Sequence, residues 1–159
     1  MASVYIETTI PSYYCETRTT PRVVAWREAT RDWWDHHSHR YELVTSQAAR
    51  SELMRAPPSK ARRALLLIKP LPILTEPREL SHVIEYYVQQ RLMPAEAGGG
   101  DAYHLAMASL HRVDYLLTWN CRHLANANKV RHIAVVNARL GLHVPVITTP
   151  LTLIPEESE

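Results

Sequence analysis

Short apolar runs alternate along the chain with longer segments of helical periodicity. The apolar runs are too short for helices, and we predict strands at 3–6, 41–46, 71–75, 114–118 and 143–148. This alternation is typical of an α/β domain with a mostly parallel central sheet. Because 159 residues are enough to bury one core, we expect a single domain, 1–159, with a frayed acidic tail at 155–159.

The segments between the strands carry helix signals. We predict helices at 21–37, 47–56, 60–69, 76–92 and 101–112. Pro21 suits the first turn of its helix, because a missing backbone N–H costs nothing there. Ser46 and Asp101 are expected to cap the helices that follow them, since short polar side chains accept hydrogen bonds from free N–H groups.

Charge and cysteine usage restrict the class of protein. The net charge is +2, which does not by itself indicate a nucleic-acid binder. Cys15 and Cys121 are too few for a disulfide framework, and we expect a cytoplasmic protein. The N-terminus does not have the pattern of a secretory signal, and no apolar run is long enough to span a membrane.

Three of the four glycines in the chain, residues 98–100, directly precede Asp101. Glycine adopts positive φ without strain, so a glycine run permits an unusual backbone path. An acid that only faces solvent does not need such an approach. We therefore expect Asp101 to meet other polar groups.

Three other residues can meet Asp101. Glu7 follows the first predicted strand, Glu52 lies in the helix after the second, and Asn120 follows the strand at 114–118. In parallel sheets, ligands bind outside the carboxyl ends of the strands. We expect these four side chains to converge there.

Taken singly, these residues have simpler explanations. Asp101 could only cap a helix, Glu52 could pair with Arg55, and Asn120 could shape a turn. Glu7 could be solvated by a turn at the strand end. Together they are harder to explain, because clustered carboxylates repel unless a cation compensates them or one is protonated.

The donor types point to the cation. Carboxylate and amide oxygens are hard ligands, which favours Mg²⁺ or Mn²⁺ over zinc. Such an ion keeps several waters, leaving positions for phosphate oxygens and an attacking water. The pattern therefore favours metal-assisted phosphodiester hydrolysis.

Four stretches carry a resemblance to a known family: "VYIETTIPSYY", "LVTSQAARSEL", "GDAYHLAMA" and "DYLLTWN". In this order they resemble the PIN domain of the VapC type, the nuclease toxin of bacterial and archaeal toxin–antitoxin pairs. The resemblance implies a three-layer α/β sandwich with a parallel sheet of about five strands. It also implies an Mg²⁺- or Mn²⁺-dependent endoribonuclease that acts on RNA, forms a homodimer and binds an antitoxin from a neighbouring gene.

Carried over by position, the metal-binding and catalytic quartet becomes Glu7, Glu52, Asp101 and Asn120. Glu7 stands where the family usually has Asp, and Asn120 is neutral where the family usually has Asp. Thr9 corresponds to the hydroxyl residue after the first acid, with Thr8 as the less favoured candidate. His104 is a possible accessory ligand or proton carrier.

The neutral Asn120 leaves an alternative open, in which a degenerate PIN domain binds RNA or a protein partner without cleavage. A Rossmann-like nucleotide-binding module is disfavoured, because "GGGD" lacks the G-x-G-x-x-G spacing.

Further polar residues could contact RNA. A basic rim near Glu52 could bind phosphates: Arg50, Arg55, Lys60, Arg62 and Arg63. Arg122 and Asn126 could bind RNA or cap local structure. The stripe Val23, Trp26, Thr30 and Trp33 is interpreted as core or dimer contact rather than as a base-stacking platform.

Overall fold

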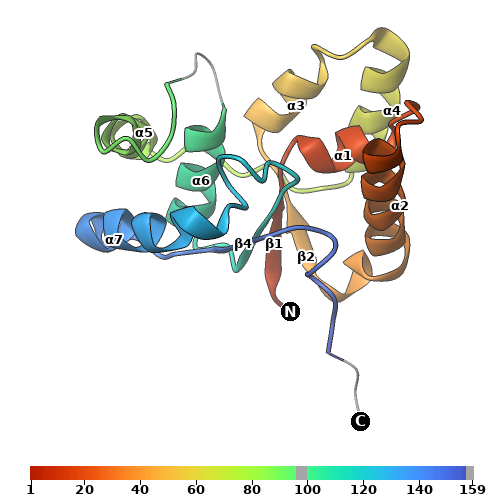
Figure 1. The fold of residues 1–159 in the computed structure, drawn as a ribbon. Helices are drawn as coiled ribbons and strands as arrows, with labels where there is room; N and C mark the ends of the chain where they lie inside the picture. The colour runs from red at the N-terminus through yellow and green to blue at the C-terminus, as the bar shows by residue number, and fades with distance from the viewer. Residues whose placement is uncertain (96–99, 157–159) are drawn as a thin grey trace.

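A parallel sheet with helices on both faces forms the centre of the molecule (Figure 1). The computed structural model describes residues 1–95 and 100–156. Gly98, Gly99 and the end of the expected tail, 157–159, lie outside the described residues. The strands are β1 (Ser3–Ile6), β2 (Glu42–Val44), β3 (Tyr115–Leu117) and β4 (Val146–Thr148).

The helices fill the connections between these strands. They are α1 (Thr9–Tyr14), α2 (Pro21–His36), α3 (Gln47–Leu53), α4 (Pro58–Ile68), α5 (Leu80–Gln89), α6 (Asp101–Leu110) and α7 (Val130–Leu140), with short 3-10 turns at Ser38–Arg40 (η1) and Ala127–Lys129 (η2). No helix in the described part of the chain is long and apolar enough to cross a membrane.

The sheet has the order β2-β1-β3-β4, and its strand pairs are parallel. β1 is a central strand, and its residues are buried on both faces. Val4 and Ile6 contribute to one core cluster, whereas Tyr5 between them contributes to the other. This alternation follows from the two-residue period of a strand. Both faces being covered explains why the strands read as continuous apolar runs.

Two helical layers enclose the sheet, as the resemblance implied. Helices α1, α2 and α4 provide Ile10, Trp33 and Ile68 to the cluster around Val4 and Ile6. Helices α5, α6 and α7 cover the opposite face (Figure 1). The three-layer α/β sandwich is therefore confirmed.

Within residues 1–95 and 100–156 the sheet has four strands rather than about five. The segment predicted as a strand at 71–75 forms only one isolated bridge, between Thr45 and Ile73. Thr45 bonds there to the carbonyl of Pro72 and to the N–H of Leu74. Pro70 and Pro72 lack the N–H groups that a strand needs on both sides, so pairing does not extend.

Helix starts agree with the sequence signals at α2 and α3, whereas α5 begins at Leu80 instead of residue 76 and α6 differs in its cap. Pro21 begins α2, and the Ser46 hydroxyl caps α3 by accepting from the N–H of Ala49 at 3.2 Å. Asp101 is the first residue of α6, and Gly100 occupies the cap position instead. Gly100 has φ of +86°, so the chain does turn through a conformation that favours glycine directly before Asp101. Two helices, α1 and α7, were not predicted.

Candidate active site

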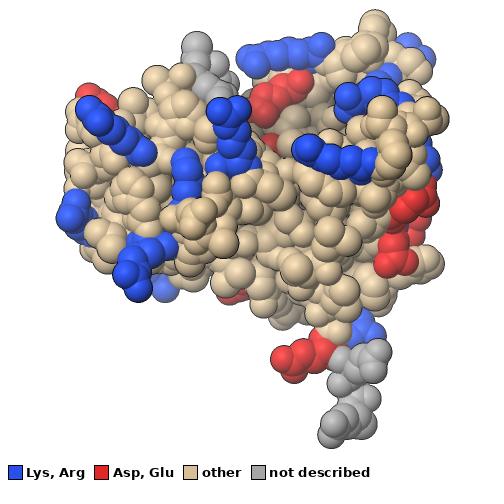
Figure 2. All heavy atoms as spheres, in the orientation of Figure 1, with Lys and Arg blue, Asp and Glu red and all other residues tan. Residues whose placement is uncertain are grey.

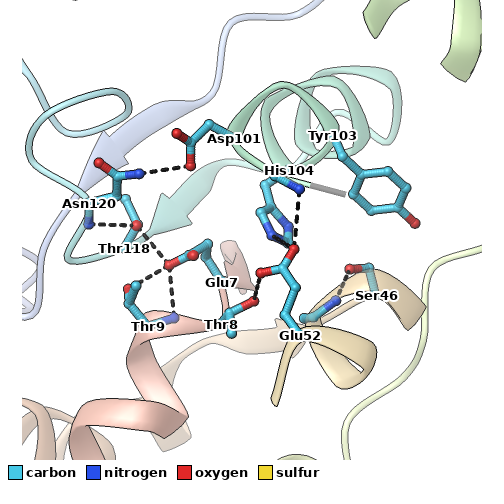
Figure 3. A network of polar contacts seen from close by, with 12 residues as sticks. Glu7, Thr8, Thr9, Ser46, Glu52, Asp101, Tyr103, His104, Thr118 and Asn120 are labelled. Atoms are coloured by element: carbon cyan, nitrogen blue, oxygen red, sulfur yellow. Dashed lines mark hydrogen bonds and ion pairs between the residues drawn. The ribbon is translucent and has the colours of Figure 1, made fainter. Parts of the chain in front are cut away.

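Polar side chains from four segments come together at the carboxyl edge of the sheet (Figure 3). Glu7 follows β1, Glu52 lies on α3, Asp101 begins α6, and Asn120 lies in the loop after β3. Glu7, Glu52 and His104 each offer one potential ligand atom, and these atoms lie within 4.8 Å of one another. Asn120 bonds to Asp101 at 2.7 Å. The structure thus places all four predicted residues, and the accessory His104, in one neighbourhood.

Glu7 is buried, with 4% of its surface exposed. One of its oxygens, Oε2, accepts from the N–H of Thr9 at 3.0 Å, from the Thr9 hydroxyl, and from the Thr118 hydroxyl at 2.8 Å. The other oxygen, Oε1, accepts no hydrogen bond from the described part of the chain. Burial raises the pKa of Glu7 above its usual value, although His104 and the Thr9 hydroxyl partly offset it. A nearby cation would stabilise its charged form.

Glu52 is held on both sides. Its Oε2 accepts from the Thr8 hydroxyl at 2.6 Å, while its Oε1 lies 2.9 Å from His104 Nε2 and accepts from the N–H of Gly100 at 3.3 Å. Burial alone would raise the pKa of Glu52, but the hydrogen bond and charge of His104 outweigh it and lower the pKa to about 2. Glu52 is therefore ionised at neutral pH.

Hydrogen bonds on both sides of the ring determine the protonation of His104. Tyr5 donates its hydroxyl proton to Ser46 at 2.7 Å, so its oxygen accepts from His104 Nδ1, also at 2.7 Å. The other nitrogen, Nε2, faces an ionised carboxylate, which only accepts. Burial would lower the pKa of His104, yet the bond to Glu52 and the surrounding carboxylates raise it. The carboxylate of Glu52 therefore favours the protonated form of His104.

Asn120 fixes Asp101 through its amide group. Its Oδ1 accepts a hydrogen bond from the backbone N–H of His123 at 3.0 Å. A backbone N–H can only donate, so the oxygen of the amide must face it. The NH₂ group therefore faces Asp101, and its Nδ2 donates to Oδ1 of that side chain at 2.7 Å. Asn120 was expected to offer its amide oxygen to a metal. In the structure this oxygen bonds to His123, and Asn120 instead orients the neighbouring acid.

This donor set fits a hard divalent cation. Glu7 and Glu52 present carboxylate oxygens in one group with His104, and Asp101 adds a third carboxylate beside it, where Asn120 holds it. A protonated imidazole has no free lone pair, so His104 adds charge balance rather than a nitrogen ligand. Three carboxyl groups beside one histidine make the donor set acidic and rich in oxygen, which suits Mg²⁺ or Mn²⁺.

Sequence reasoning missed part of this network. Thr8 bonds to Glu52, so both hydroxyls after Glu7 contact site acids, rather than Thr9 alone. Thr118 links the β3 loop to Glu7, and Tyr5 orients His104 from β1. Thr118 lies two residues from Asn120, a spacing that could have drawn attention to it. Nothing in the sequence indicated that the buried Tyr5 contacts the site.

The residues expected to form a basic rim or to bind RNA make different contacts in the structure. Lys60 pairs with Glu16 at 2.8 Å, and Arg63 donates to the carbonyl of Cys15 at 3.4 Å, so both tie helices together. Asn126 caps η2 by accepting from the N–H of Asn128. Other Lys and Arg side chains lie around the acidic side chains near the top centre of this view (Figure 2).

Comparison with known proteins identifies the fold. No protein-family model matches the sequence, and no curated protein matches it. The chain is similar in structure to VapBC2 from Rickettsia felis, solved bound to a DNA fragment from its promoter. The TM-score is 0.51 at 8% identity, over 92% of this chain and 98% of that chain. It is also similar to FitAcB from Neisseria gonorrhoeae, with a TM-score of 0.53 at 16% identity, over 94% of this chain and 99% of that chain.

These alignments span nearly the whole of both chains, so the likeness concerns the complete domain. The chain therefore has a PIN-like fold, as the sequence resemblance implied. The site residues described above lie where parallel α/β sheets bind ligands, outside the carboxyl ends of the central strands.

Proposed function

We propose that this protein is a metal-dependent endoribonuclease and the toxin of a toxin–antitoxin pair. One observation carries the proposal: ligand atoms of Glu7, Glu52 and the buried His104 lie within 4.8 Å of one another beside Asp101, and one oxygen of Glu7 accepts no hydrogen bond from the described residues. A purely structural ion pair would not require the second and third acids. The PIN fold supports the same conclusion.

Glu7 and Asp101 would hold the ion most directly, with Glu52 assisting. When bound, a divalent cation would activate water and stabilise the negative charge that develops on the phosphate. Thr9 and Thr118 fix the rotamer of Glu7, so its second oxygen keeps one direction. Asn120 orients Asp101 in the same way. The chain therefore presents preformed oxygens, which reduces the cost of organising the site.

The test is RNA cleavage by the purified protein with and without divalent ions. Cleavage should stop in EDTA and return when Mn²⁺ or Mg²⁺ is added in excess. Direct metal binding, followed by isothermal titration calorimetry without RNA, gives a second result that does not depend on turnover. Metal binding without cleavage of any RNA would contradict the nuclease proposal.

The two similar structures are VapBC2 and FitAcB, and they support a protein partner. We propose an antitoxin encoded next to this protein, whose basic side chain reaches the acidic site, and a homodimeric toxin. Sedimentation should give a dimer. Co-expression with the adjacent reading frame should give a complex in which cleavage is inhibited.

A PIN domain that binds without cleaving is the second candidate. The observation that favours it is the neutral Asn120 in place of the family's usual acid. Such a protein would retain RNA or partner binding in EDTA and show no turnover with any divalent ion.

A further inference from the structure

Three side chains form a layered stack beside the candidate site. The rings of Trp119 and Trp26 are stacked, with centroids 4.5 Å apart and an angle of 11° between planes. The guanidinium carbon of Arg22 lies 4.4 Å from the Trp26 ring centroid. Trp26 is thus stacked on both Trp119 and Arg22, one from the β3 loop and one from the first turn of α2.

The inner end of this stack is fixed to the catalytic residues. Trp119 lies between Thr118, which bonds to Glu7, and Asn120, which bonds to Asp101. Its backbone N–H donates to the Thr9 hydroxyl at 2.8 Å. The indole N–H donates to Thr30 at 2.7 Å, and only 3% of Trp119 is exposed. The position of the stack relative to the acids is therefore well defined.

Arg22, at the outer end of the stack, is less constrained than Trp119 at the inner end. Arg22 is exposed and makes no hydrogen bond or ion pair with the residues that the structure describes. Nearby arginines are engaged: Arg18 pairs with Glu16, and Arg27 with Glu28, each at 3.1 Å. The stack therefore ends in an unpaired planar cation.

We infer that this stack is a nucleobase platform, on which a base next to the cleaved phosphodiester bond stacks against the outer face of Arg22. The inference rests on the proposed function for its substrate class. Planar guanidinium groups stack on unpaired RNA bases as aromatic rings do. The Trp26 ring, backed by Trp119, positions the guanidinium over its face, which lowers the conformational entropy lost on binding. The positive charge also offsets the repulsion between the site acids and the RNA backbone.

The test is the affinity of short fluorescent single-stranded RNA for parent and variants, measured by anisotropy in EDTA so that the RNA remains intact. Arg22→Lys keeps the charge but removes the planar face, and Arg22→Gln removes both. Both should weaken binding roughly fivefold or more, as expected for the loss of a stacked base. Arg40→Gln is the matched control, because exposed Arg40 lies before β2, at the opposite edge of the sheet. It should change affinity less than about twofold.

A set of RNA probes with one base removed at successive positions isolates the stacking contribution. The parent should lose affinity at one position, and Arg22→Lys should show no further loss there. Equal affinity of Arg22→Lys and parent, or no RNA binding by the parent, would overturn the platform. Cleavage assays with Mn²⁺ separate the two proposals: binding that depends on Arg22 without any turnover overturns the nuclease function but supports the platform.

Discussion

Two buried glutamates at either end of the α1 segment have opposite electrostatic environments. Glu7 and Glu16 are 4% and 5% exposed. Glu16 is neutralised by the chain itself, through Arg18 at 3.1 Å and Lys60 at 2.8 Å, and the N–H groups of Thr17 and Arg18 bond to its other oxygen. Its pKa is well below the usual range, mainly because of Arg18.

Glu7 receives hydrogen bonds from neutral groups on one oxygen only, and burial raises its pKa. Glu16 is paired with two cations of its own chain, whereas Glu7 has only His104 nearby and keeps one oxygen without a hydrogen bond from the described residues. Under the proposed function, an added cation would satisfy that oxygen.

The largest expected effect is loss of cleavage on removal of the site charges. Glu7→Gln and Asp101→Asn keep the shape of each side chain but remove a negative ligand. We expect cleavage to fall by at least about 100-fold, and metal affinity measured by calorimetry to fall with it. The fold should survive, because the free energy of unfolding of Glu7→Gln in EDTA no longer includes the cost of burying a charge.

The same substitution at Glu16 is the matched comparison and should have the opposite outcome. Glu16→Gln leaves Lys60 and Arg18 without their anion, so we expect a loss of about 2 kcal/mol in the free energy of unfolding. Cleavage by the folded protein should stay within twofold of the parent. Urea titration of both Gln variants gives the result, and a stability loss at Glu7 equal to that at Glu16 would remove the distinction between them.

Acid titration sharpens the comparison further. The pKa of Glu16 is lower in the folded than in the unfolded state, so its stabilisation is present above the unfolded pKa and is lost as pH falls. The stability difference between parent and Glu16→Gln should therefore shrink as the pH falls below about 5, and it should keep shrinking toward the lowered folded-state pKa. The pKa of Glu7 is raised in the folded state, so its protonation stabilises the fold as the pH falls. The pH dependence of the free energy of unfolding that Glu7 contributes therefore has the opposite sign to that of Glu16. Urea denaturation in EDTA at several pH values measures both contributions. The same sign of pH dependence for Glu7 and Glu16 would contradict the prediction.

The sequence predicts the position of Glu7 in this contrast, but it does not predict the pairing of Glu16. Strand ends and helix starts fix where Glu7, Glu52, Asp101 and Asn120 fall, and a parallel sheet gathers those positions at one edge. The pairing of Glu16 depends on α4 bringing Lys60 to α1, a contact across 44 residues that periodicity does not reveal.

Other features of the fold and the site were also not predicted from the sequence. The predicted strand at 71–75 is interrupted by prolines. The proton positions around His104 depend on Tyr5, which contacts it, and on Ser46, which bonds to Tyr5 from a separate segment. The amide orientation of Asn120 is set by the N–H of His123 in the folded loop. Such contacts follow from tertiary packing and have no spacing signature along the chain.

The smallest expected effect concerns Asn120 and the charge of the site. In Asn120→Asp the NH₂ group that bonds to Asp101 becomes a carboxylate oxygen, so two acids face each other at hydrogen-bond distance. Their repulsion raises the affinity for a cation that lies between them. We expect the Mn²⁺ concentration for half-maximal RNA cleavage to fall roughly three- to tenfold, with a higher concentration needed for Mg²⁺ than for Mn²⁺ in both proteins.

The exposed Asn128, in the same polar segment, provides the control, because Asn128→Asp adds the same charge away from the acids. Metal titrations of the parent and both variants should be run side by side. An unchanged or higher metal requirement in Asn120→Asp would mean that this residue does not act on the cation. The site would then consist of three acids, and Asn120 would be limited to orienting Asp101. A fall of equal size in Asn128→Asp would attribute the effect to net charge alone, because only the carboxylate at 120 contacts Asp101 directly.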